Sequence, residues 1–113
     1  MERRQHPRVI LRAWAQCLAG KRSFLCAARD ISLGGMLLEA HLHAPPAPGE
    51  PLAITLVGLS ELPLACEVVR IADDGAFAVR YVDLPAASRE DVQRIVDAAA
   101  ESRLHRGAPE GRE

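Results

Sequence analysis

Residues 9–29 decide the fold, and they read V-I-L-R-A-W-A-Q-C-L-A-G-K-R-S-F-L-C-A-A-R. Over residues 9–18, apolar side chains occupy alternate positions while Arg12 falls on the opposite side. A period of two is typical of a β-strand with one buried face. Residues 19–22 fit a hairpin turn, and residues 23–29 return as a second strand. The stretch therefore predicts an antiparallel hairpin.

Further strands follow this hairpin at short intervals. An Asp-Gly pair at residues 74–75 predicts another tight hairpin, and the proline-rich residues 44–51 separate two of the strands. Short connections favour antiparallel pairing, and a small closed barrel removes exposed sheet edges. We therefore predict a mainly β fold, a six-stranded antiparallel barrel over residues 9–84, whose four later strands cover residues 36–40, 52–57, 64–72 and 76–82.

Only the end of the chain has a helical pattern. Its apolar residues recur at helical spacing, and Ser88 with Asp91 resembles a capping box. These features predict a C-terminal α-helix over residues 88–104, with its regular part beginning near Arg89, that packs on the barrel. Residues 105–113 lack an apolar anchor and are expected to be a disordered tail.

Composition limits the class of protein. The chain has 113 residues, of which 49% are hydrophobic and 4% aromatic, enough for one domain with an aliphatic core. It contains no apolar run of membrane-spanning length and no signal-peptide pattern, so a cytoplasmic protein without membrane insertion is expected. Three widely spaced cysteines, Cys17, Cys26 and Cys66, are expected to be buried, reduced thiols.

Charge is unevenly distributed along the chain. Residues 1–29 hold seven basic residues and one acidic residue, whereas residues 30–113 hold seven basic and fourteen acidic residues. This pattern fits either a solvated basic segment or a local anion site on an acidic body. A net charge of −1 argues against a general nucleic-acid binder.

Common catalytic and metal-binding patterns are missing from the sequence. No G-x-S-x-G, H-E-x-x-H or Walker loop occurs, so an enzyme is not expected. His41 and His43 could share one strand face, but without a second pair of ligands an exposed strand end explains them better than a metal site. No metal and no cofactor are therefore predicted.

Two motifs flank the first hairpin. Arg4 and Arg8 form R-x-x-x-R, with Arg3 before it, and residues 30–35 form D-x-S-x-x-G. Their order and separation resemble the PilZ domain, a bacterial receptor for cyclic di-GMP. The segments C-E-V-V-R at 66–70 and G-A-F-A-V-R-Y-V-D-L at 75–84 strengthen the resemblance. It covers residues 1–104 as a domain, and the chain is expected to be a single-domain member.

The resemblance implies a PilZ-type β-barrel with a C-terminal helix, and it assigns the ligand site. Arginines of a mobile arm, residues 1–8, wrap over cyclic di-GMP, while the D-x-S-x-x-G loop borders the same ligand. The implied ligand-binding residues are Arg3, Arg4, Arg8, Asp30, Ser32 and Gly35.

The residue types suit this ligand. The planar fork of arginine can bind a phosphate or the O6 and N7 edge of guanine with two hydrogen bonds, and it can stack on a purine. Asp30 can accept from guanine N1–H and N2, and Gly35 would leave room for a base. Asp30 and Ser32 could instead cap backbone amides of a turn. Arg70 fits either the rim of the site or a surface ion pair, and Trp14 fits packing better than stacking on guanine.

The expected function is a cyclic di-GMP receptor and adaptor. Ligand capture would order the arm and change affinity for an unidentified partner protein in motility, pilus, biofilm or related output, through the helix or the proline-rich loop. The main alternative is a ligand-independent PilZ-type scaffold that only docks proteins. Binding of nucleic-acid polymers is not expected, and the motifs leave open whether one or two ligand molecules bind.

Overall fold

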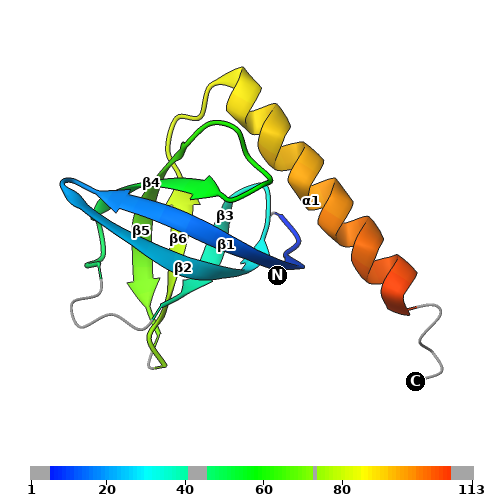
Figure 1. The fold of residues 1–113 in the computed structure, drawn as a ribbon, viewed down its shortest axis with the longest axis horizontal. Coiled ribbons are helices and arrows are strands. Elements are labelled where there is room, and N and C mark those ends of the chain that lie inside the picture. The colour runs from blue at the N-terminus through cyan, green and yellow to red at the C-terminus, as the bar shows by residue number, and fades with distance from the viewer. Residues whose placement is uncertain (1–5, 41–45, 73, 108–113) are drawn as a thin grey trace.

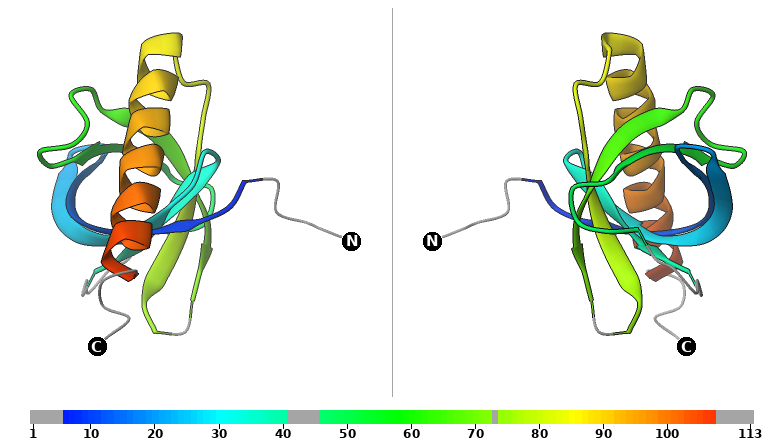
Figure 2. Two further views of the ribbon diagram at one scale, coloured as in Figure 1. Left: turned by 90° about the vertical axis from the view of Figure 1, so that its right-hand side faces the viewer. Right: turned by 90° about the vertical axis from the view of Figure 1, so that its left-hand side faces the viewer.

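The computed structural model describes residues 6–40, 46–72 and 74–107, with side chains described as far as Ser102. These residues form a closed antiparallel barrel with the strand order β1-β2-β3-β6-β5-β4 and one helix (Figure 1). Figure 2 shows that the helix lies along one side of the barrel. The predicted fold class is confirmed. The elements are β1 (Val9–Ala19), β2 (Arg22–Ile31), β3 (Gly35–Glu39), β4 (Pro51–Leu56), β5 (Leu64–Ile71), β6 (Ala76–Tyr81) and α1 (Ala86–Gly107).

The β1–β2 hairpin forms where the alternating pattern predicted it. Along β1, buried residues such as Ala15 and Cys17 alternate with exposed ones such as Arg12, so one side of the strand faces the core. The turn uses Gly20 at a φ of 63°, a backbone conformation that glycine adopts without steric cost. β1 also pairs with β4, and this pairing closes the barrel.

The loop predicted to begin at Asp30 begins later. β2 continues through Asp30 and Ile31, because these residues pair with Leu37 and Met36 of β3. A register shift lies just before Asp30 on this pairing. Such a bulge bends a strand and changes the direction of its side chains, and it brings Asp30 to the end of β2 beside the turn into β3.

The core is aliphatic, as the composition predicted. All three cysteines contribute to it as free thiols, which confirms the predicted burial. Cys17 and Cys26 lie on adjacent strands with their sulfur atoms 3.8 Å apart. Burial raises the pKa of the Cys66 thiol to about 12, so it stays protonated at neutral pH. The largest fully buried side chains include Phe77, Ile31, Met36, Leu38, Ile54, Leu56, Leu64 and Val68.

Helix α1 differs from the prediction at both ends. It begins at Ala86, because Pro85 stands directly before the first turn, where its missing N–H and fixed φ are tolerated. Ser88 therefore lies inside the first turn and does not cap the helix. The helix continues to Gly107, a residue type that often ends helices, so the predicted tail over residues 105–113 begins too early.

The helix is held by apolar contacts and by one carboxylate. Val92 and Ile95 are buried in the same core as the barrel strands, and α1 packs against β1. Asp91, predicted as part of a capping box, instead accepts a hydrogen bond from the backbone amide of Glu61 at 3.2 Å and pairs with Arg94. The helix therefore docks the β4–β5 connection as well as the barrel.

Within the described part of the chain, no helix is both long and apolar enough to cross a bilayer. The same residues contain no group of three or more His, Cys, Asp or Glu side chains placed to hold a metal ion. His41 and His43 lie outside the described residues.

Candidate ligand-binding site

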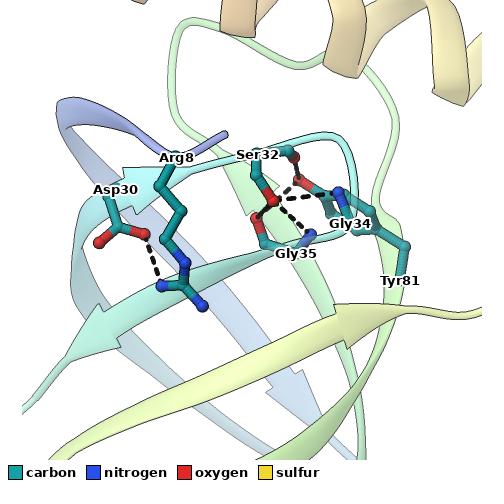
Figure 3. Close-up of polar contacts among 6 residues, drawn as sticks. All are labelled: Arg8, Asp30, Ser32, Gly34, Gly35 and Tyr81. Carbon is teal, nitrogen blue, oxygen red and sulfur yellow. Dashed lines mark hydrogen bonds and ion pairs between the residues drawn. The ribbon is translucent and has the colours of Figure 1, made fainter. Parts of the chain in front are cut away.

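The two sequence motifs meet at the start of β1. Val9 pairs with Ile31, so the antiparallel register brings the residue before β1 to the end of β2. Arg8 Nη1 donates to Asp30 Oδ1 at 3.0 Å (Figure 3). The side chains of Arg8 and Asp30 are 30% and 21% exposed, so both remain accessible from solvent. The structure therefore joins Arg8 of one motif and Asp30 of the other in one partly exposed ion pair.

Ser32 holds the turn between β2 and β3. Its hydroxyl oxygen accepts hydrogen bonds from the amides of Gly34 at 3.0 Å and Gly35 at 3.2 Å. Its own amide donates to the carbonyl of Gly35 at 2.9 Å. Ser32 is buried, and it serves the amide-capping role given above as an alternative to ligand contact. Asp30 does not share that role, because its carboxylate is paired with Arg8.

Gly35 is required by strand pairing. A Cβ atom at this position would lie 2.0 Å from the carbonyl oxygen of Val79 on β6. The sequence suggested that Gly35 leaves room for a ligand base, but the space is taken by the neighbouring strand. A glycine lets β3 and β6 approach closely here, so this residue shapes the site from behind.

Tyr81 supports the same turn from β6. Its hydroxyl donates to the carbonyl of Ser32 at 3.1 Å and lies 3.4 Å from the carbonyl of Gly35 (Figure 3). Burial is the main reason that the pKa of the Tyr81 phenol is raised above its ordinary value. The turn is thus fixed from both sides, by Ser32 within it and by Tyr81 behind it.

A shallow hollow of about 230 Å³ opens beside this turn. Its wall combines the segment before β1, the β2–β3 turn and the outer side of β5 and β6. Three arginines line it, and two carboxylates outside the lining pair with them: Asp30 accepts from Arg8 at 3.0 Å and Glu67 accepts from Arg80 at 2.6 Å. The arginines outnumber the nearby carboxylates, so the hollow favours an anionic ligand. Its lining residues are His6, Arg8, Ser32, Gly34, Gly35, Val69, Arg70, Ala78, Val79 and Arg80.

Four of the six predicted site residues lie at this place. Arg8, Ser32 and Gly35 line the hollow, and Asp30 is bound to Arg8 at its edge. Arg3 and Arg4 lie outside the described residues. Ligand contact by each of the six stays a prediction.

The sequence left the places of Arg70 and Trp14 open. Arg70 lines the hollow, and among the described residues it has no ion pair, which favours the rim position over the surface ion pair. Trp14 is 59% exposed on the outer side of β1, so little of its side chain makes the packing contacts that the sequence favoured for it. It falls on the outer side because it shares the face of Arg12 in the strand alternation.

Sequence reasoning missed Val69, Arg80 and Tyr81. Arg80 and Tyr81 join the site because β6 pairs with β3, with Gly35 opposite Arg80, and because the Tyr81 amide donates to the carbonyl of Gly34 at 3.2 Å. Val69 joins it because β5, which carries this residue, pairs with β6. The segment R-Y-V-D-L contributed to the family resemblance, but no local pattern in it indicated that Arg80 and Tyr81 lie beside residues 32–35.

Comparison with known proteins gives a consistent result. A family model described as the PilZ domain matches residues 2–98. The PilZ domain of YcgR from Escherichia coli, solved with c-di-GMP, superposes with a TM-score of 0.74 at 16% identity, over 96% of this chain and 98% of that one. None of the curated proteins compared with the chain matches it significantly.

Two further solved structures show the same architecture. The inhibitor of motility MotI/DgrA of Bacillus subtilis superposes with a TM-score of 0.73 at 17% identity, over 93% of this chain and 53% of that one. This chain thus spans about half the length of that protein. The PilZ domain of CeSA from a cellulose-synthesizing bacterium gives 0.69 at 19% identity, over 81% and 96%. Because the PilZ model spans most of the chain and the barrel superposes on the PilZ domains of YcgR and CeSA, the chain belongs to the PilZ domain family.

Proposed function

We propose that this PilZ domain binds cyclic di-GMP in the hollow beside the β2–β3 turn. The observation that carries the proposal is the ion pair of Arg8 with Asp30 at the edge of a hollow lined by Arg70 and Arg80. Cyclic di-GMP is a dianion with two guanines, so it needs guanidinium groups for phosphate and for guanine O6 and N7, and a carboxylate for guanine N1–H and N2. These groups lie side by side here.

Arg8 and Asp30 can leave their ion pair and contact the ligand instead at a small cost in free energy. Because both side chains are partly exposed, their mutual attraction contributes little free energy, of the order of 1 kcal/mol or less. On binding, Asp30 would accept from a guanine while Arg8 turns to a phosphate or a second guanine edge. Arg3 and Arg4 would add cationic groups from the preceding segment, as the family motif implies.

Isothermal titration calorimetry with cyclic di-GMP tests the proposal on the wild type and on Arg4→Ala, Arg8→Ala and Asp30→Ala. Each substitution removes a charged or bidentate contact, so affinity should fall roughly ten- to a hundredfold. Lys21→Ala is the charge-matched control, because Lys21 lies in the β1–β2 turn and not in the hollow. Heats that are equal in all variants, or absent in the wild type, would overturn the proposal.

Two added conditions sharpen the measurement. Affinity should decrease as salt increases, because partly exposed charges are screened. Excess single-stranded RNA should not displace the dinucleotide, whereas a general nucleic-acid surface would bind both. The fitted stoichiometry distinguishes one bound ligand from two. Absence of binding by the wild type would favour the ligand-independent scaffold.

The wider role that we propose is that of a non-enzymatic adaptor in the cytoplasm. Free cysteine pairs such as Cys17 and Cys26, with sulfur atoms 3.8 Å apart, are maintained in a reducing compartment. Ligand binding would order the segment before β1 and pass the signal to a partner protein. Motility, pilus and biofilm systems are the proposed outputs, since one structural neighbour is an inhibitor of motility.

A further inference from the structure

The outer side of the β1–β2 hairpin carries large apolar side chains that face solvent. Trp14 and Leu18 on β1, Leu25 on β2 and Val57 after β4 are each about half exposed or more. We call these four residues the outer hairpin face. Figure 1 looks onto this side of the barrel, where β1 and β2 lie in front and α1 lies toward the opposite end of the hairpin from its turn.

The strand register makes these residues neighbours. Trp14 pairs with Ala27 on β2, and on its other side the Val57 amide donates to the Trp14 carbonyl at 2.9 Å. Two positions further, Gln16 lies opposite Leu25. Leu18 follows after two more, opposite Ala53 of β4. Residues two apart on a strand share a face, so the four side chains form one continuous surface.

A larger hollow adjoins this surface. It has a volume of about 600 Å³, and Trp14, Ile10, Arg12 and Arg29 are among the residues that line it. It lies where the β1–β2 register shifts between Ile10 and Ala13. A concave site next to an exposed tryptophan is suited to receive side chains of another protein, since buried Trp and Arg dominate the energy of many interfaces.

Most of the charged side chains around the face are basic. Arg12 stands at one end, and Lys21 and Arg22 stand at the hairpin turn at the other end. Two nearby acidic side chains are already paired with arginines: Asp30 on β2 lies 3.0 Å from Arg8, and Glu39 on β3 lies 3.8 Å from Arg29. The basic residues of the first 29 that the proposed ligand site does not use are therefore gathered around this surface.

We infer that the outer hairpin face docks a segment of a partner protein that carries apolar side chains flanked by Asp or Glu. Apolar contacts would supply affinity, and the acidic flanks would meet Arg12 at one end and Lys21 and Arg22 at the other. The inference rests on the proposed function only in that the docked protein would receive the ligand signal. Arg8 stands directly before β1 and Asp30 lies on β2, so both strands of the hairpin connect the two sites.

Two other occupants fit less well. A symmetric pair of copies would place the same basic residues against each other, which opposes association. An anionic bilayer would match the charge, but the hollow beside Trp14 is concave, and the surface of a bilayer does not fill it. A protein segment can fill the hollow with its side chains.

The test uses a phage-displayed library of random peptides selected against the whole protein. Enriched peptides should combine apolar residues with Asp or Glu, and a synthetic copy of the most enriched one should shift the fluorescence of Trp14 to shorter wavelength. Trp14 is the only tryptophan of the chain, so the signal reports this face directly. Peptides that are basic or uncharged, or no enrichment at all, would overturn the inference.

Matched variants locate the binding. Leu18→Ser should weaken the peptide roughly tenfold or more, whereas Leu62→Ser should not, although the two leucines are 49% and 48% exposed. The pair Arg12→Glu and Lys21→Glu should weaken it further and reduce its salt dependence. Equal effects of Leu18→Ser and Leu62→Ser would contradict the proposed location.

Two measurements address the other occupants. A fluorescence shift of Trp14 with vesicles of anionic phospholipid would overturn the inference in favour of a membrane. Sedimentation that shows a dimer lost in Leu18→Ser would overturn it in favour of a second copy. The affinity of Leu18→Ser for cyclic di-GMP, measured by calorimetry, should match that of the wild type. The proposal for the docking surface and the proposal for the ligand site are therefore tested by independent measurements.

Discussion

Two pairs of residues within the candidate site differ in what holds them. Ser32 and Gly35 are fixed by the protein itself, through hydrogen bonds to backbone amides and through contact with the carbonyl of Val79. Arg8 and Asp30 contact each other by a single hydrogen bond at 3.0 Å and remain partly exposed. The first pair builds the surface, and the second pair presents charge on it.

This difference distinguishes two roles that a residue of a binding motif can have. A residue can belong to a motif because it touches the ligand or because it shapes the backbone that does. In the D-x-S-x-x-G motif, Ser32 and Gly35 shape the backbone, whereas Asp30, two and five residues before them, is proposed to touch the ligand. Substitutions should therefore divide into those that lower folding stability and those that lower affinity in a stable fold.

The largest effect is expected for Gly35→Ala. The new Cβ would lie 2.0 Å from a backbone oxygen on β6, so β3 and β6 must separate. The free energy of unfolding, measured by urea denaturation, should fall by about 3 kcal/mol or more. Gly34→Ala is the control, because its Cβ would lie 3.2 Å from a His6 side-chain atom that can move. Similar losses in both variants would contradict the explanation.

A smaller loss is expected for Ser32→Ala. The substitution leaves the amides of Gly34 and Gly35 without their hydroxyl acceptor, in a buried turn. Unfolding free energy should fall by about 2 kcal/mol, with a secondary loss of ligand affinity as the turn loosens. Ser23→Ala, at an exposed position of β2, should change stability by less than about 0.5 kcal/mol. Normal stability with lost affinity would place Ser32 among the ligand contacts instead.

Tyr81→Phe removes the hydroxyl that supports the turn from behind, at a cost of about 1 kcal/mol at neutral pH. The pKa of Tyr81 is raised in the folded state, so the native protein holds this proton more tightly than the unfolded chain. Its contribution is therefore complete below the ordinary pKa near 10 and is lost as pH rises toward the native pKa. The stability difference between wild type and Tyr81→Phe should shrink above pH 10. A constant difference would show that the proton is not involved.

The smallest effect on stability is expected at the charged pair. In a double-mutant cycle with Arg8→Met and Asp30→Asn, the coupling in unfolding free energy should be about 1 kcal/mol or less, because the pair is partly exposed. Ligand affinity of the same variants should fall at least tenfold if they form the contacts proposed above. A large coupling in stability would place this pair with Ser32 and Gly35 as a structural element.

The local elements were predictable because their signals are local. Alternation over residues 9–18 indicated the first strand, and the structure has β1 over Val9–Ala19. The apolar surroundings of Cys66 indicated a buried thiol, which was confirmed. The helix start was missed because Ser88 was preferred as a cap over the position directly after Pro85, where the helix begins.

The sequence by itself determined the strands, the aliphatic core and the two motifs, since strand alternation and turn residues act between near neighbours in the chain. Only the tertiary structure decided that β6 occupies the space on one side of the β2–β3 turn. Closure of the barrel pairs β6 with β3, and this pairing explains why Gly35 must be glycine, why Tyr81 holds the turn and why Arg80 lines the hollow. Such pairings join residues 37 to 45 positions apart, and no pattern within a short window encodes them.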